Sequence, residues 1–342
     1  NQDRKKSKNY SSLSGLYQFI SPYTGASILA LVVLIVTAGL SLTLPLAVRR
    51  VVDGFSEGSN DLINEYFLAA IGIAGLLALG TATRFYLVTR LGERVVADIR
   101  KAVFNRVISM SPEFYEKIMT GEVLSRLTTD TTLILTVVSS SVSLALRNIL
   151  IFIGGIFFMF ITSAKLTALA FLIVPTIIFP VLLLGKKLRI LSKYSQDKIA
   201  DTSGTASEML IAFQTVQANT HEFFSQEIFS NMTEDSFQIA KKRIMIRAIF
   251  TALLIFFVFT GIVGVLWFGA LNVRSNTMSE GELVQFLIYS VLVAGSVAAL
   301  SDTFGEIQRA AGASERLLEL LNLNDPIKES EKPIKLKETF NS

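Results

Sequence analysis

Long stretches without formal charge are the feature of this sequence that most limits what it can fold into. The stretch from Ala248 to Val273 contains no Asp, Glu, Lys or Arg, and neither does the stretch from Tyr66 to Thr83. A third stretch, Leu133 to Ala164, carries one formal charge, Arg147. A helix needs about 20 predominantly apolar residues to cross the hydrocarbon layer of a membrane. These stretches therefore predict membrane-spanning helices.

The overall composition points to the same class of protein. Hydrophobic residues make up 51% of the 342 residues and charged residues only 18%, and the mean hydropathy is +0.52. Soluble domains of this size carry more charge. The formal net charge of +4 is typical of basic cytosolic loops, so we expect membrane lipid around the chain and no nucleic-acid partner. We expect an all-α, multi-pass integral membrane protein.

Six spans follow from the apolar pattern and from the positions of proline and charge. We expect them at about 23–48, 64–110, 133–164, 166–219, 222–273 and 279–323. At about 1.5 Å per residue the second span would reach about 70 Å, so it must continue into the cytosol. We expect Arg49 and Arg50 to end the first span, before a short acidic loop. Ser163 to Lys165 predicts a very tight external turn.

Basic residues are distributed unevenly along the chain. They gather in the tail and the polar extensions, at Arg4, Lys5, Lys6, Lys8, Arg90, Arg94, Arg100, Lys101, Lys186, Lys187, Arg189, Lys193, Lys198, Lys241, Lys242, Arg243 and Arg247. The expected external loops hold Arg49, Arg50, Lys165 and Arg274. This bias places both termini on the cytosolic or matrix side. Residues 1–22 then form a cytosolic tail and a short interfacial helix.

Five segments carry a resemblance to a known family. They are FYEK at 114–117, TGEVLSRLTTD at 120–130, FQTVQANTHE at 213–222, SEGELVQFLIY at 279–289 and QRAAGASERLLELL at 308–321. Together they resemble the transmembrane domain of ABC exporters of the half-transporter type, which includes multidrug exporters and lipid flippases. The resemblance implies the type I exporter fold over residues 23–323. It also implies ATP-driven movement of a lipid, hydrophobic drug or peptide by alternating access, with a bacterial inner membrane favoured over the mitochondrial one.

The same resemblance implies partners and contact residues. Short connections at about 112–118 and 219–225 would couple to nucleotide-binding domains, the second to that of the partner subunit. The residues expected there are Phe114, Tyr115, Glu116, Lys117, Gly121, Glu122, Arg126, Thr220, His221, Glu222 and Phe223. The partner would be a second copy of this chain or a homologous half-transporter, with the homodimer favoured.

Local chemistry near the first connection supports a helix. Glu122 and Arg126 are spaced four apart, which suits an ion pair on a helix, and Thr120 could cap its start. The alternative to a coupling role is that this segment is simply the well-capped start of a cytosolic helix. His221 is the only histidine and cysteine is absent, so we expect no metal site and interpret His221 as a surface contact.

The sequence predicts no catalytic site of its own. A phosphate-binding loop needs the pattern Gly-x-x-x-x-Gly-Lys-Ser/Thr, whereas the only Gly-Lys pair is Gly185-Lys186, followed by Lys187. We expect no cofactor here, with ATP and Mg²⁺ on the implied nucleotide-binding domain of a transport ATPase. Residues 336–342 resemble that domain's opening strand. We therefore expect 324–342 to be a linker within a longer protein, in preference to a stand-alone subunit.

Polar residues inside the spans are candidates for a substrate cavity. They are Arg147, Asn148, Gln285 and Tyr289. A charge within a membrane helix suggests function, but Arg147 could equally make a structural pair or extend to the interface. The other three could equally form hydrogen bonds between helices.

Two other classes of function remain open. One is a six-helix channel or passive carrier, which would need a re-entrant filter or rings of polar residues near the midplane. No such pattern is evident in the sequence. The other is a non-transporting membrane scaffold or regulator. An electrophoretic flux assay would support the channel, and failure of any ATP-binding domain to associate would support the scaffold.

Overall fold

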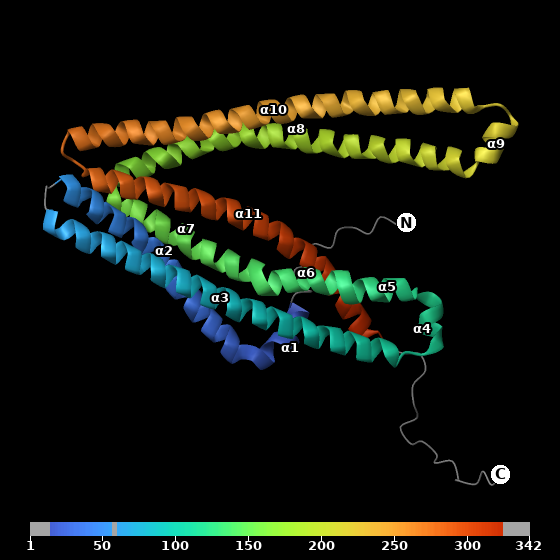
Figure 1. The fold of residues 1–342 in the computed structure, drawn as a ribbon, viewed down its shortest axis with the longest axis horizontal. Helices are drawn as coiled ribbons and strands as arrows, with labels where there is room; N and C mark the ends of the chain where they lie inside the picture. The colour runs from blue at the N-terminus through green and yellow to red at the C-terminus, as the bar shows by residue number, and fades with distance from the viewer. Residues whose placement is uncertain (1–13, 57–59, 324–342) are drawn as a thin grey trace, which may run out of the picture. The chain divides into compact units, whose positions relative to one another are not determined.

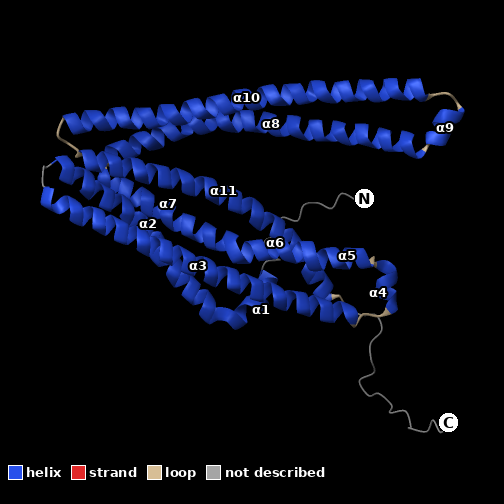
Figure 2. Ribbon diagram, viewed as in Figure 1, coloured by secondary structure: helices blue, strands red, loops and turns tan. Residues whose placement is uncertain are grey.

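The computed structural model describes residues 14–56 and 60–323, and within these ranges all regular structure is helical (Figure 2). Six helical segments in the described part are long and apolar enough to cross a membrane. They are Ser14–Phe55, Asn64–Ile108, Thr120–Thr162, Ala164–Ile211, Glu222–Arg274 and Glu280–Asn322. The predicted all-α fold with six long apolar helices is thereby confirmed. The basic tail, residues 1–13, and the expected linker, 324–342, lie outside the described residues.

The chain forms two compact units, of which the first comprises residues up to Thr162 and from Glu280 onward. Its elements are α1 (Tyr17–Ile20), η2 (Ser21–Tyr23), α2 (Thr24–Ser56), α3 (Asn60–Ile108), α4 (Pro112–Lys117), α5 (Thr120–Ser125), η3 (Arg126–Asp130), α6 (Thr131–Thr136), η4 (Val137–Ser141), α7 (Val142–Thr162) and α11 (Glu280–Asn322). Helix α2 packs along α3, and α11 packs along α7 and α2 (Figure 1).

Helix α2 is longer than predicted. The sequence suggested that Arg49 and Arg50 end it, but the helix continues to Ser56. The reason is that Arg49 has acidic partners: its Nε lies 3.3 Å from Asp53 Oδ2, one turn along the same helix, and its Nη2 lies 2.8 Å from Glu282 Oε1 on α11. Arginine is compatible with a helix, so these charges can mark the end of the apolar span without ending the helix itself.

The third span is also longer than predicted. Instead of starting at Leu133, the helix begins at Thr120 and continues to Thr162 through two π-helical segments, η3 and η4. π-helical turns inside α-helices are often found at functional sites. Ser163 alone separates α7 from α8, and its Oγ accepts a hydrogen bond from Leu166 N at 3.3 Å. A single residue therefore connects the two helices, as short a connection as the sequence predicted.

The second unit is a hairpin of two long helices. It contains α8 (Ala164–Ile211), α9 (Phe213–Ala218) and α10 (Glu222–Arg274), with α8 packed along α10 (Figure 1). Pro175 and Pro180 lie within α8 without ending it. The sequence predicted a helix to about Asn219, whereas α8 ends at Ile211 and the short α9 follows.

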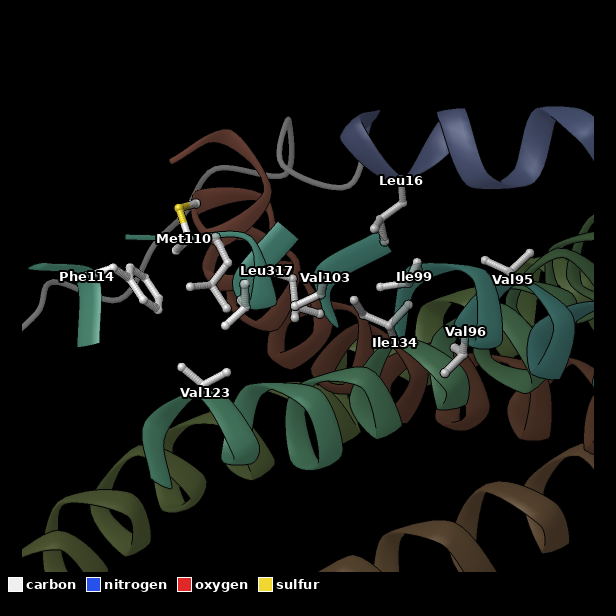
Figure 3. Packing of buried hydrophobic residues seen from close by; sticks show 12 residues of the cluster. Leu16, Val95, Val96, Ile99, Val103, Met110, Phe114, Val123, Ile134 and Leu317 are labelled. Carbon is white, nitrogen blue, oxygen red and sulfur yellow. The ribbon is translucent and has the colours of Figure 1, made fainter. Parts of the chain in front are cut away.

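The main hydrophobic core of the first unit lies at the end that carries α4, as Figure 3 shows. Its buried members are Leu16, Val95, Val96, Ile99, Val103, Val107, Met110, Phe114, Val123, Ile134, Leu317 and Leu320. On α3, Val95 lies about 47 Å from Asn64 at about 1.5 Å per residue, which exceeds a hydrocarbon layer of about 30 Å. The polar extensions are therefore held together by a core of their own.

Candidate functional site

Helix α4 is fixed firmly to the end of α3. Pro112 is its first residue, a position that suits proline because the missing N–H would have no partner there. The Phe114 side chain is only 8% exposed and belongs to the core. The Tyr115 hydroxyl donates to the carbonyl of Val107 at 2.9 Å, and its ring lies 5.1 Å from that of Phe114. Phe114 thus anchors α4 in the core, and the Tyr115 hydroxyl holds it against α3.

The outer face of the first connection is accessible. Tyr115 and Glu116 are exposed, and Met119 is 82% exposed. The side chain of Lys117 lies outside the described part of the structure. Met119 is the N-cap residue of α5, so exposed side chains on α4 and just after it could form a docking surface that loses little conformational entropy on binding.

Arg126 is the centre of a charged network in the segment that follows α4 in the chain. Its Nη2 donates to Glu122 Oε1 at 2.6 Å, which confirms the ion pair predicted from the spacing. Its Nη1 donates to the backbone carbonyl of Arg316 on α11 at 3.0 Å and lies 3.9 Å from Glu319 Oε2. The Arg126 side chain is 9% exposed. A buried guanidinium with partners on two elements joins α5 and η3 to α11.

A second pair strengthens the same junction. Both oxygens of Asp130 accept from Arg316, Oδ2 from Nε at 2.8 Å and Oδ1 from Nη2 at 2.5 Å. Such two-point contacts are the strongest type of ion pair in proteins. The sequence analysis did not select Asp130 or Arg316. The available signal was their opposite charge within two of the family-like segments, at the end of 120–130 and inside 308–321.

Two residues predicted for this region play smaller parts. Thr120 does not cap the helix, because Met119 occupies the N-cap position and no side chain bonds to the first turn. Thr120 is already helical, so its hydroxyl cannot reach the free N–H groups. Gly121 lies beside open space, since a Cβ added there would meet no atom within 4 Å.

The second connection is a short helix followed by a sharp turn. Helix α9 precedes the range predicted for it, and the turn to α10 uses Thr220, whose φ is 52°. His221 occupies the N-cap position of α10, and its ring lies 4.7 Å from that of Phe224. Glu222 is in the first turn of α10, and Phe223 is 82% exposed. This tip therefore presents an aromatic side chain to solvent.

Two of the cavity candidates are buried between helices. Tyr289 is 0% exposed, donates to the Leu42 carbonyl at 2.6 Å, and stacks on Phe158 at 5.3 Å. Gln285 is 2% exposed and donates to Thr162 Oγ1 at 2.8 Å. These contacts join α11 to α2 and α7. For these two residues the structure favours the alternative of hydrogen bonding between helices.

The other two candidates are half-buried on α7. Arg147 donates from Nη2 to Ser41 Oγ at 3.3 Å, and Asn148 donates to the Leu144 carbonyl at 2.8 Å. An apolar groove lies between α7 and α11, lined by Phe152, Val297, Leu300, Ser301 and Phe304. In the described ranges no three His, Cys, Asp or Glu side chains are placed to hold a metal ion.

Comparison with known proteins places the chain in a family. Residues 27–297 match the family described as ABC transporter transmembrane region. ABC transporter B family member 1 of Dictyostelium discoideum is 28% identical over 322 residues, 94% of this chain and 35% of that protein. The mitochondrial ATP-dependent permease MDL1 of Schizosaccharomyces pombe is 30% identical over 301 residues, 86% of this chain and 42% of that protein.

A fungal relative gives the same result. The ABC multidrug transporter mdr2 of Aspergillus fumigatus is 28% identical over 300 residues, 85% of this chain and 38% of that protein. The chain spans less than half of the length of each of these three relatives. The matched region contains four of the six long helices completely, about two thirds of the first and less than half of the last. The chain therefore belongs to the ABC transporter transmembrane region family.

Proposed function

We propose that this chain is the membrane part of an ATP-driven exporter, in which α4 and α9 receive force from ATP-binding domains. The observation that carries the proposal is the attachment of the first connection at two places: Phe114 fixes α4 in the core, and the network of Arg126 and Asp130 ties α5 and η3 to α11. A transporter that alternates between two packed states needs such rigid transmission, because a flexible loop would absorb the motion.

The names of two relatives support ATP-driven transport as the activity of the complete protein. One is called an ATP-dependent permease and another an ABC multidrug transporter. By analogy, the exporter would assemble from two such chains, a homodimer or a pair of homologous half-transporters, each joined to a nucleotide-binding domain that supplies ATP and Mg²⁺. Both termini and both connections would face the cytosol or matrix, as the distribution of lysine and arginine favours.

The test is whether the Arg126 network couples ATP hydrolysis to substrate. The full-length protein is reconstituted in lipid vesicles, and its ATPase rate is measured with and without a panel of lipids, drugs and peptides. We expect Arg126→Ala to abolish substrate stimulation while retaining most ATP binding, since the Arg316 carbonyl and the carboxylates of Glu122 and Glu319 lose the cation that they share. Lys101→Ala, an exposed cation on α3, is the control and should keep the stimulation.

Other outcomes would point to other classes of protein. Stimulation that survives in Arg126→Ala would mean that the network is structural only. An ion current through the reconstituted protein that persists without ATP would favour a channel. Absence of any ATPase activity and of any associated ATP-binding protein would favour a scaffold and overturn the exporter proposal.

A further inference from the structure

A π-helical segment divides the third long helix of the first unit. This segment, η4 (Val137–Ser141), lies between α6 and α7 (Figure 1). At its end the N–H of Val142 donates to the carbonyl of Val137, five positions back, where an α-helix would use four. Val142 lies about 30 Å from Thr162 at about 1.5 Å per residue, which is the thickness of a hydrocarbon layer. Measured from the end that we propose faces outward, η4 therefore lies at the inner boundary of the membrane.

Hydroxyl side chains supply additional hydrogen bonds around this segment. Ser139 Oγ donates to the Leu135 carbonyl at 2.5 Å, and Ser140 Oγ donates to the Thr136 carbonyl at 2.7 Å. Thr136 Oγ1 donates in turn to the carbonyl of Thr132 at 3.1 Å. Such hydroxyl groups often bend helices, and they can satisfy a carbonyl whose backbone hydrogen bond is lost. The backbone can therefore bend at η4 without leaving carbonyls unsatisfied at the edge of the membrane.

The hydroxyl group of Ser141 has two acceptors within reach. The side chain is 0% exposed, and its Oγ lies 2.5 Å from Glu306 Oε2 on α11 and 3.2 Å from the carbonyl of Thr136. A hydroxyl group has one proton to donate, so it can bond fully to only one acceptor at a time. The bond to Glu306 joins η4 to α11, whereas the bond to Thr136 stays within the third helix.

The parts of the helix on either side of η4 are held in different surroundings. On the side of α5 and α6, Val123 and Ile134 belong to the hydrophobic core. On the other side, α7 packs along α11 and buries Ile151 and Met159. A hinge joins two such packed bodies through a short segment that can change its backbone geometry. The segment η4 meets this description.

We propose that η4 is a hinge of the third helix and that the hydrogen bond from Ser141 to Glu306 holds it closed. When the Ser141 hydroxyl turns to the Thr136 carbonyl, α7 can tilt relative to α6 while the core at the other end stays intact. This inference goes beyond the proposed function, because the hinge is a property of the first unit alone and needs no ATP.

The experiment measures the opening of η4 directly. Hydrogen–deuterium exchange of the full-length protein in detergent, without ATP, is followed by mass spectrometry for peptides that cover 137–142. Glu306→Ala should make these amides exchange about tenfold faster, because a hydrogen bond to a charged group is lost. Ser141→Ala removes the same bond from the other side and should have the same effect. Glu306→Gln keeps an acceptor oxygen and should retain most of the protection.

The matched control for these variants is another carboxylate on α11. Asp302 lies one turn before Glu306 and is exposed, so Asp302→Ala should leave the exchange of 137–142 unchanged. Protection that is the same in Glu306→Ala, Ser141→Ala and the unaltered protein would overturn the hinge.

A deletion of one residue tests whether η4 holds an inserted residue. Because a π-helical turn contains one residue more than an α-helical turn, deletion of Ser140 should leave α6 and α7 in register and convert η4 to an α-helix. This variant should give a monodisperse peak in size-exclusion chromatography, and its amides near η4 should exchange more slowly. Deletion of Leu144 within α7 would rotate every later residue by about 100°, so it should abolish the peak.

Loss of the peak in both deletion variants would mean that η4 holds no inserted residue, and the hinge would fall. The exchange of these amides and the substrate-stimulated ATPase rate are separate readouts. The hinge can therefore fail while the exporter proposal holds, and the reverse.

Discussion

At the scale of single residues, the contact between Asp130 and Arg316 joins η3 to α11 through two hydrogen bonds. The Asp130 side chain is 8% exposed, and both of its oxygens accept from one guanidinium. Residues far apart in the sequence thereby fix the geometry of η3 against α11. A buried carboxylate without its partner is costly, so neither residue can be replaced alone without loss.

We expect Asp130→Asn to destabilise the protein by about 2 kcal/mol, because the neutral amide leaves Arg316 without its two-point anion. The readout is the temperature at which the monodisperse peak disappears in size-exclusion chromatography after heating. Asp302→Asn, an exposed carboxylate on α11, should leave that temperature unchanged. Arg316→Gln and the double variant complete the comparison. If the double variant lowers the temperature by the sum of the two single effects, the two residues do not interact as described.

At the scale of elements, the close approach of α3 to η4 depends on one glycine. A Cβ added at Gly92 would lie 2.7 Å from Ser139 Cβ and 3.0 Å from its backbone. The Ser139 hydroxyl already donates to the Leu135 carbonyl at 2.5 Å, which keeps the serine turned into its own helix. The π-helical segment and the glycine together allow these two helices to pack closely.

Gly92→Ala should therefore push α3 away from η4 and cost about 1–3 kcal/mol, as overpacking does elsewhere. Gly75→Ala on the same helix is the matched control, because its Cβ would meet no atom within 4 Å. The same heating assay should show a lower unfolding temperature for the first variant only. Equal behaviour of the two would mean that α3 and η4 are not in close contact.

At the scale of the whole first unit, an ion pair joins α2 to α11 at the end opposite the core. Arg49 contacts Glu282 at 2.8 Å, and Asp53 Oδ1 accepts from the N–H of Gly281 at 2.9 Å. Both side chains of the pair are partly exposed, so it should contribute about 1 kcal/mol. We propose that this end faces outward, where the ion pair would hold the ends of α2 and α11 together.

Exchanging the two charges tests the ion pair of Arg49 and Glu282. Arg49→Glu alone should lower the unfolding temperature, because it places three carboxylates together, and Glu282→Arg added to it should restore part of the loss. The effect should shrink at high salt, since partly exposed charges are screened. If the double variant unfolds at the same temperature as Arg49→Glu at low salt, the two residues do not contact one another.

The sequence predicted more of the fold than of the site. The six spans and the pair of Glu122 and Arg126 followed from charge-free stretches and from helical spacing, both of which are local properties. The contact of Asp130 with Arg316 depends on residues 186 positions apart, which spacing cannot reveal. Arg49 was misread because a charge normally marks the end of a span, and its partner Glu282 lies on another helix.

The hairpin of the second unit has a mechanical consequence. Helix α8 has 48 residues and, at about 1.5 Å per residue, is about 72 Å long. A tilt of only about 5° about its first residue would carry its far end through about 6 Å, roughly the pitch of one helical turn. The tip that bears Phe223 would thus act as the end of a long lever, where a small angle at one end becomes a large stroke at the other.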